Sequence, residues 1–248
     1  MDNITYVYRF LSIKGGVGKT LFALSLAVTR KPEGNLLYID ASENQMAWYY
    51  LDKEKEFDEY FALAKNYYKK DSTFYILRLY KDFSNEQIDF KKYIDGTKWK
   101  YVIVDTRSSM HPSQPLFEIT GRLGTVNIFI ADLPSLSDTL NYIKLWNEYK
   151  QRFTHRLLVI NFVRSVTMEY VEKIGRNMVK GILYPPEELE FVEFDDDILS
   201  QEPKETIKLP SNLPFLPEEE EETKNKKGEE HESIKKRLIF TKCLYKIK

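Results

Sequence analysis

The sequence predicts an α/β fold built on a single doubly wound, mostly parallel sheet with helices on both faces. Apolar runs of strand length alternate with longer segments in which apolar residues recur at helical spacing. This alternation is typical of parallel sheets covered by helices. Several of the strand-length runs are apolar throughout, as expected for strands buried on both faces.

The predicted elements follow in chain order. The first strand covers residues 6–13, and after a glycine-rich loop Phe22, Ala23, Leu26 and Ala27 recur at helical spacing. The later strands are predicted at residues 36–39, 101–104, 126–131 and 157–160. Between the last two, one helix face is formed by Leu136, Leu140, Ile143 and Trp146. That helix supplies the crossover which a parallel strand pair needs.

Length and composition indicate one domain followed by a polar tail. A chain of 248 residues with 42% hydrophobic residues is long enough for one substantial core. We predict the domain at residues 1–208 and a linker rich in Pro, Glu and Lys at 209–232. Residues 233–248 are basic and apolar, and we expect a terminal helix or arm there.

Charge and cysteine content exclude several functions. Lys and Arg total 37 against 38 Asp and Glu, so overall charge predicts no nucleic-acid coat. The only cysteine, Cys243, cannot form an internal disulfide or a multi-thiolate metal site. The sequence has neither a secretory signal nor an apolar run of the roughly 18 residues that a membrane span needs. We therefore expect a cytoplasmic protein.

A phosphate-binding loop is predicted at residues 14–20, with the sequence KGGVGKT between a strand and a helix. Glycines let backbone N–H groups surround an anion, and the helix N-terminus adds a favourable dipole. Lys19 supplies a positive charge for the β- and γ-phosphates, and the Thr20 hydroxyl can bind Mg²⁺. The predicted class is thus a Rossmann-like P-loop NTPase with ATP or ADP and Mg²⁺ as cofactors. The predicted nucleotide-binding residues are Gly15, Gly16, Val17, Gly18, Lys19, Thr20, Leu21 and Asn161.

The loop resembles the deviant phosphate loop of the ParA/MinD family of ATPases, because Ile13 replaces the first glycine of the general pattern and Lys14 is an additional lysine. In that family the additional lysine reaches the nucleotide of the partner subunit. The resemblance therefore implies an ATP-dependent homodimer. It also implies that Lys14, Lys19 and Asp40 are the catalytic residues.

The resemblance extends to the strand ends. YVIVD, ending at Asp105, is similar to the family's second acidic motif, which supports the water shell of Mg²⁺. IDASENQ, containing Asp40, occupies the place of the family's DxDPQ segment. The metal-supporting residues are therefore expected to be Thr20, Asp40 and Asp105. Asn161 matches a position where the family binds adenine, although an ordinary turn is an alternative reading.

The chain departs from the family at two positions. Ser42 stands where the second carboxylate of DxD is tied to hydrolysis, and Leu21 stands where a hydroxyl is usual. Without that carboxylate we expect ATP binding with weak or atypical hydrolysis. Glu43 is one residue away and is a candidate replacement.

Such an ATPase could act on DNA or on a membrane, and DNA is the first hypothesis. Partition-type members bind DNA nonspecifically, and Arg164, Lys173, Arg176 and Lys180 are the candidate phosphate contacts here. This reading implies plasmid or chromosome segregation, a DNA- or nucleoid-associated location and a ParB-like or other adaptor protein. MinD-like membrane docking through residues 233–248 is the second hypothesis. A nucleotide-gated regulatory scaffold without productive turnover is the third.

Overall fold

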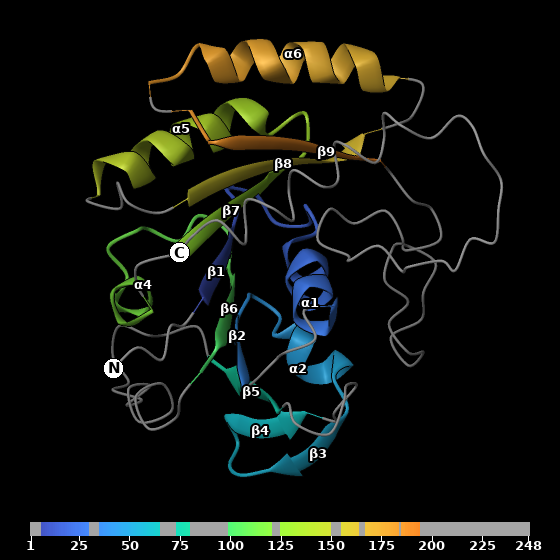
Figure 1. Cartoon of the computed structure of the whole chain (residues 1–248), viewed down its shortest axis with the longest axis vertical. Coiled ribbons are helices and arrows are strands. Elements are labelled where there is room, and N and C mark those ends of the chain that lie inside the picture. Colours follow the sequence, from blue (N-terminus) through green and yellow to red (C-terminus); the bar gives the residue numbers. More distant parts are fainter. Residues whose placement is uncertain are drawn as a thin grey trace, which may run out of the picture.

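The computed structural model describes residues 6–29, 35–64, 73–79, 99–120, 125–149, 155–163, 167–183 and 185–193. The predicted linker at 209–232, the terminal segment at 233–248 and Arg164 lie outside these ranges. Within them the chain forms a nine-stranded sheet in the order β3-β4-β5-β2-β6-β1-β7-β8-β9 (Figure 1). The predicted α/β class with a mostly parallel sheet is confirmed.

Each predicted strand is present, and several extend further than predicted. The strands are β1 (Tyr6–Leu11), β2 (Leu36–Ala41), β3 (Lys53–Glu56), β4 (Phe61–Ala64), β5 (Phe74–Arg78), β6 (Tyr101–Thr106), β7 (Thr125–Ala131), β8 (His155–Val163) and β9 (Glu188–Glu193). Every neighbouring pair from β5 to β9 across the sheet is parallel. The carboxyl ends of these strands therefore lie at one edge of the sheet, where open α/β sheets bind ligands.

The helices cover both faces of the sheet (Figure 1). They are α1 (Lys19–Thr29), α2 (Met46–Tyr50), α4 (Pro115–Ile119), α5 (Leu136–Glu148) and α6 (Met168–Lys180). Side chains of α1 and α2 share one buried cluster with the sheet, and those of α4, α5 and α6 share the other. This division follows from the period of two along each strand, which sends successive side chains to opposite faces.

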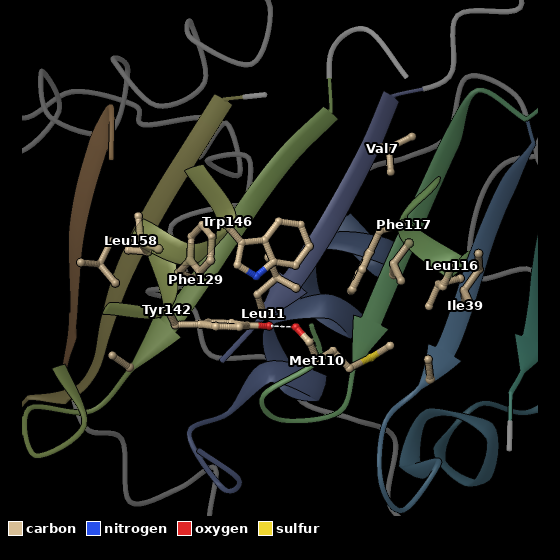
Figure 2. Close-up of a cluster of buried hydrophobic side chains, with 14 of the residues drawn as sticks. Val7, Leu11, Ile39, Met110, Leu116, Phe117, Phe129, Tyr142, Trp146 and Leu158 are labelled. Atoms are coloured by element: carbon tan, nitrogen blue, oxygen red, sulfur yellow. Dashed lines mark hydrogen bonds between the residues drawn. The ribbon is translucent and has the colours of Figure 1, made fainter. Parts of the chain in front are cut away.

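The second cluster contains the larger aromatic network (Figure 2). Trp146 of α5 makes edge contacts with Phe117 of α4 and Phe129 of β7, at ring-centroid distances of 4.7 and 6.2 Å. Tyr142 of α5 also donates a hydrogen bond to the carbonyl of Met110, in the loop after β6. Packing of α5 therefore fixes the loop that follows β6.

The hairpin of β3 and β4 was not predicted from the sequence. β4 pairs antiparallel with both β3 and β5, so this hairpin extends the parallel sheet at one edge. The β3 segment KEKE has no apolar alternation, and its side chains are mostly exposed. Alternating charges are typical of an edge strand that must not pair with another chain.

Candidate functional site

The loop between β1 and α1 has the backbone shape of a phosphate cradle. Gly16 and Gly18 have φ angles of 75° and 94°, in the left-handed region that glycine adopts without steric cost. Val17 between them is 1% exposed and anchors the loop in the core. The helix starts at Lys19, so its unpaired N–H groups face the loop.

Lys19 is buried beside the loop, where its Nζ donates hydrogen bonds to Ser12 Oγ at 2.8 Å and to Ser108 Oγ at 3.3 Å. Burial lowers the pKa of Lys19, while the negative charges of Asp105 and Glu43 oppose this shift. The ammonium group has two neutral hydroxyl partners and nearby carboxylates. A phosphate group that replaced the hydroxyls would give it a stronger, charge-assisted hydrogen bond.

Asp40 lies at the carboxyl end of β2 and is fully buried. Its Oδ1 accepts a hydrogen bond from the Ser42 hydroxyl at 2.6 Å, and its Oδ2 accepts one from the Trp48 amide at 3.0 Å. Burial raises the pKa of Asp40, and the hydrogen bonds from Ser42 and Trp48 oppose this rise. Ser42 therefore orients Asp40 in this structure.

Asp105 is the register partner of Asp40 on the adjacent strand β6. Its Oδ2 accepts a hydrogen bond from the Tyr38 hydroxyl at 3.2 Å. Its Oδ1 is buried and has no hydrogen-bond partner among the residues that the structure describes. Burial and the neighbouring charge of Asp40 raise the pKa of Asp105 from 3.8 to about 7.

These side chains fit a magnesium site of the kind that P-loop proteins use. Mg²⁺ needs few protein ligands there, because waters and phosphate oxygens complete its shell. The unpaired Oδ1 of Asp105 and the nearby Thr20 supply oxygens of the preferred type. Within the described ranges no group of three or more His, Cys, Asp or Glu side chains forms a self-contained metal site. The donor set therefore fits a cation that arrives with phosphate.

Glu43 contacts the loop that follows β6 and lies within electrostatic range of Lys19. Its Oε1 accepts a hydrogen bond from the Ser108 amide at 2.6 Å. Burial raises the pKa of Glu43, but hydrogen bonds from the Ser108 and Glu43 amides outweigh burial, and the net shift is downward. A charged carboxylate is thus held near Lys19.

Lys14 points to β7 in this structure. Its Nζ forms an ion pair with Asp132 Oδ2 at 2.8 Å, directly after the end of β7. Ser135 donates to the other carboxylate oxygen through its amide at 3.0 Å. The Lys14 side chain is 54% exposed, so it is accessible to a second molecule once the ion pair opens.

Two hydrogen bonds attach the loop after β6 to Ser12 and Ile13, which lead from β1 into the phosphate loop. Ser109 donates through its amide to the Ser12 carbonyl at 2.8 Å and through its hydroxyl to the Ile13 carbonyl at 2.7 Å. Thr106, the last residue of β6, also donates a hydrogen bond to the carbonyl of Phe10 in β1 at 2.5 Å. A shift of the phosphate loop would therefore reach the loop after β6 and, through Met110, helix α5.

Asn161 lies at the end of β8 and contacts the phosphate loop. Its Nδ2 donates a hydrogen bond to the Val17 carbonyl at 3.0 Å. The predicted nucleotide-binding residue Leu21 is half-buried in the first turn of α1, and Gly15 is exposed. The structure thus brings the loop, Asp40, Asp105 and Asn161 together at one edge of the sheet.

The candidate DNA-binding side chains lie on α6, which packs on β8 and β9 away from the phosphate loop (Figure 1). Lys173, Arg176 and Lys180 are exposed along one face of this helix. Arg176 forms an ion pair with Glu172 at 3.7 Å and lies 5.6 Å from the ring of Phe191. Lys173 and Lys180 are therefore the better candidates for contacts with a partner.

Sequence reasoning missed several contributors to the site. Ser12, Ser108 and Ser109 connect the two loops, Tyr38 binds Asp105, and Asp132 holds Lys14. The one available signal was position, because Asp132 follows directly after the predicted strand 126–131 and Ser108 and Ser109 come shortly after the predicted strand 101–104. Serine and aspartate at strand ends are too common for that signal to identify a partner.

Several solved structures have a fold similar to that of this chain. MinD in a MinC:MinD cell division complex from Aquifex aeolicus matches with a TM-score of 0.54 at 18% identity, over 78% of this chain and 83% of that chain. A ParA family ATPase from Chlorobium tepidum matches with 0.53 at 17% identity, over 80% and 87%. A Borrelia burgdorferi plasmid partition protein bound to AMPPNP matches with 0.52 at 17% identity, over 78% and 86%.

No protein-family model and no curated protein sequence matches the chain. The strand order, the glycine loop and the helix that follows it define an α/β fold of the P-loop NTPase type. Within that class, the fold is that of the ParA/MinD ATPases. Among the described residues no helix is both long and apolar enough to cross a membrane.

Proposed function

We propose that this protein binds ATP together with Mg²⁺ and uses the nucleotide to control association between two copies of the chain. The observation that carries the proposal is the pairing of a buried, weakly partnered Lys19 with the unpaired buried oxygen of Asp105 beside a glycine loop. Both groups are costly to bury without a strong partner. A magnesium triphosphate would supply a partner for each.

The loop amides and Lys19 would hold the phosphates, while Thr20, Asp40 and Asp105 would support the metal. When bound, Mg²⁺ supplies positive charge that offsets the charge developing on the phosphate oxygens. Lys14 would leave Asp132 and approach the nucleotide of the second subunit. An AMPPNP-bound neighbour of the same fold supports the nucleotide part of this proposal.

Turnover is proposed to be slow. Ser42 has no carboxylate, and its hydroxyl is hydrogen-bonded to Asp40, so it does not orient an attacking water. Glu43 is the candidate carboxylate for orienting the water, because it is held beside Ser108 and within electrostatic range of Lys19. The protein would then remain in the ATP state longer than an efficient ATPase.

Calorimetric titration with ATP, in the presence and absence of Mg²⁺, tests the nucleotide proposal. We expect magnesium-dependent binding that is lost in Lys19→Ala and retained in Lys180→Ala, a matched lysine change on α6. Absence of any magnesium-dependent uptake by folded wild-type protein would refute the proposal.

For the biological role, we propose ATP-dependent, nonspecific association with DNA, which would place the protein on the nucleoid. The exposed Lys173 and Lys180 on one face of α6 would contact the DNA phosphates. Plasmid or chromosome segregation with an adaptor protein is the process that such binding would serve.

Sedimentation of the protein with ADP, ATP and a nonhydrolysable analogue, with and without DNA, measures dimerisation and DNA binding together. Vesicle binding that requires residues 233–248 would instead support membrane positioning.

A further inference from the structure

Strand β8 ends in an irregularity that directs Asn161 towards the phosphate loop. Pairing between β8 and β9 shifts register between Ile160 and Val163. Within this bulge Phe162 has a φ of 62°, in the left-handed region that is unfavourable for an aromatic residue. Bulges often change the direction of a side chain next to a functional site, and strained residues persist where surrounding structure holds them.

The contact made by Asn161 is specific and buried. Its side chain is only 6% exposed, and its Nδ2 donates to the Val17 carbonyl at 3.0 Å. Since a carbonyl oxygen can only accept, the amide must present its nitrogen to the loop. Val17 lies between the two glycines with positive φ, so this hydrogen bond holds the most strongly bent part of the loop.

Asn161 also lies too close to Gly18 for this residue to carry a side chain. A Cβ added to Gly18 would lie 2.8 Å from Asn161 Nδ2. The loop and the amide therefore fit against each other at a residue whose φ of 94° already requires glycine. The hydrogen bond fixes the part of the loop whose amides would face phosphate oxygens.

We propose that Asn161 is a positioning residue, which holds the phosphate loop in its binding shape through its hydrogen bond to the Val17 carbonyl. This assignment deepens the proposed function and rests on it. A residue that preorganises the loop contributes equally to every ligand that carries the same phosphates. A residue that binds adenine contributes only when the base is present.

The experiment compares magnesium ATP with magnesium tripolyphosphate, which has no base or sugar. Affinities of wild-type protein and Asn161→Leu for both ligands are measured by calorimetry at a temperature well below unfolding. We expect both affinities to fall about tenfold, and by the same factor, in the variant. Hydrogen exchange of the ligand-free protein should show faster exchange for the peptide covering residues 12–22.

Asn127→Leu is the matched control, because Asn127 is a similarly buried asparagine in β7. It should lower the unfolding temperature without changing either affinity. Asn161→Gln, which keeps an amide donor, should recover part of the lost tripolyphosphate affinity. If Asn161→Leu does not fold, Asn161→Ala, which also lacks the donor, is used in its place.

A loss of ATP affinity with unchanged tripolyphosphate affinity overturns the assignment and makes Asn161 a base ligand. Unchanged affinity for both ligands overturns it as well. Wild-type protein that binds neither ligand refutes the proposed function itself, and the assignment falls with it. Equal losses for both ligands support the assignment.

Discussion

Asp40 and Asp105 are register partners on the adjacent parallel strands β2 and β6, and both carboxyl groups are fully buried. Two acids in this arrangement cannot both ionise without cost, because each raises the free energy of the other's charged form. The pair lies at the sheet edge near Lys19, whose positive charge only partly offsets this cost. The ligand-free site is therefore poised to bind a cation.

The first prediction concerns stability and pH. The pKa of Asp105 is raised from 3.8 to about 7, so between these values the folded protein keeps a proton that the unfolded chain releases. The free energy of unfolding of the ligand-free protein should therefore fall as pH rises through this window. The Asp105 contribution to the slope is at most about 1.4 kcal/mol per pH unit, the limit for one proton. Urea unfolding at several pH values measures it.

Asp105→Asn removes this contribution and should make the slope between pH 4 and pH 7 smaller, although burial also raises the pKa of Asp40 and this group gives part of the slope that remains. Asp132→Asn is the matched control. Burial raises the pKa of Asp132, but hydrogen bonds from Lys14 and Ser135 outweigh burial and the net shift is downward. The contribution of Asp132 to the pH dependence of stability therefore lies below this window. The pKa of His155 is raised by its hydrogen bond to Glu188, which gives a further loss of stability as pH rises through that higher value. That contribution is the same in all three proteins. Equal slopes in wild type and Asp105→Asn would contradict the prediction.

The parallel core of the fold was predictable because its strands are continuous apolar runs. Each run of β1, β2, β6, β7 and β8 is buried almost throughout, so composition alone indicates them. β3 could not be predicted, because its residues are polar and its pairing is set by β4 and the turn between them. The sequence of such a strand does not by itself indicate strand structure, because pairing with the neighbouring strand stabilises it.

The site was predictable where chemistry constrains residue type. The glycines, Lys19 and the acids at strand ends are needed for phosphate and metal, so their spacing was informative. Partners such as Tyr38 and Asp132 depend on which strands become neighbours, and strand order is not encoded in any short motif. β6 lies between β2 and β1 in the sheet although many residues separate it from both in sequence.

The second prediction concerns the ion pair between Lys14 and Asp132. If Lys14 must reach a partner's nucleotide, this contact at 2.8 Å has to open first. Partly exposed ion pairs contribute about 0.2–1 kcal/mol, and a symmetric dimer opens one in each subunit, so Asp132→Asn should strengthen ATP-dependent dimerisation by up to about thirtyfold. Sedimentation velocity over a range of protein concentrations with a nonhydrolysable ATP analogue measures the dimer fraction.

Lys14→Ala should abolish that dimer while the monomer still binds ATP. A dimer that weakens in Asp132→Asn would show instead that the carboxylate contributes to the interface.

The third prediction concerns turnover. Glu43→Gln removes the charge but keeps the size of the side chain, and should leave ATP affinity within about twofold while slowing phosphate release at least tenfold. Glu54→Gln on the exposed strand β3 is the control for a loss of charge far from the site. Phosphate release is followed in single-turnover experiments, so that product release does not mask the chemical step. An unchanged rate in Glu43→Gln would eliminate this carboxylate from the reaction.

The last prediction concerns DNA. Lys173 and Lys180 are exposed on one face of α6, whereas Arg176 is occupied by Glu172 and Phe191. Each lysine that contacts a phosphate releases about one counterion, so the double variant Lys173→Ala, Lys180→Ala should lower the salt slope of ATP-dependent DNA binding by about two. Fluorescence anisotropy with labelled duplexes of two unrelated sequences, at several salt concentrations, gives this slope.

The control is the double variant Lys53→Ala, Lys55→Ala, which lies at the opposite edge of the sheet and should retain the wild-type slope. Since nonspecific binding depends on phosphates alone, both duplexes should lose affinity equally, and a loss confined to one of them would indicate base contacts instead.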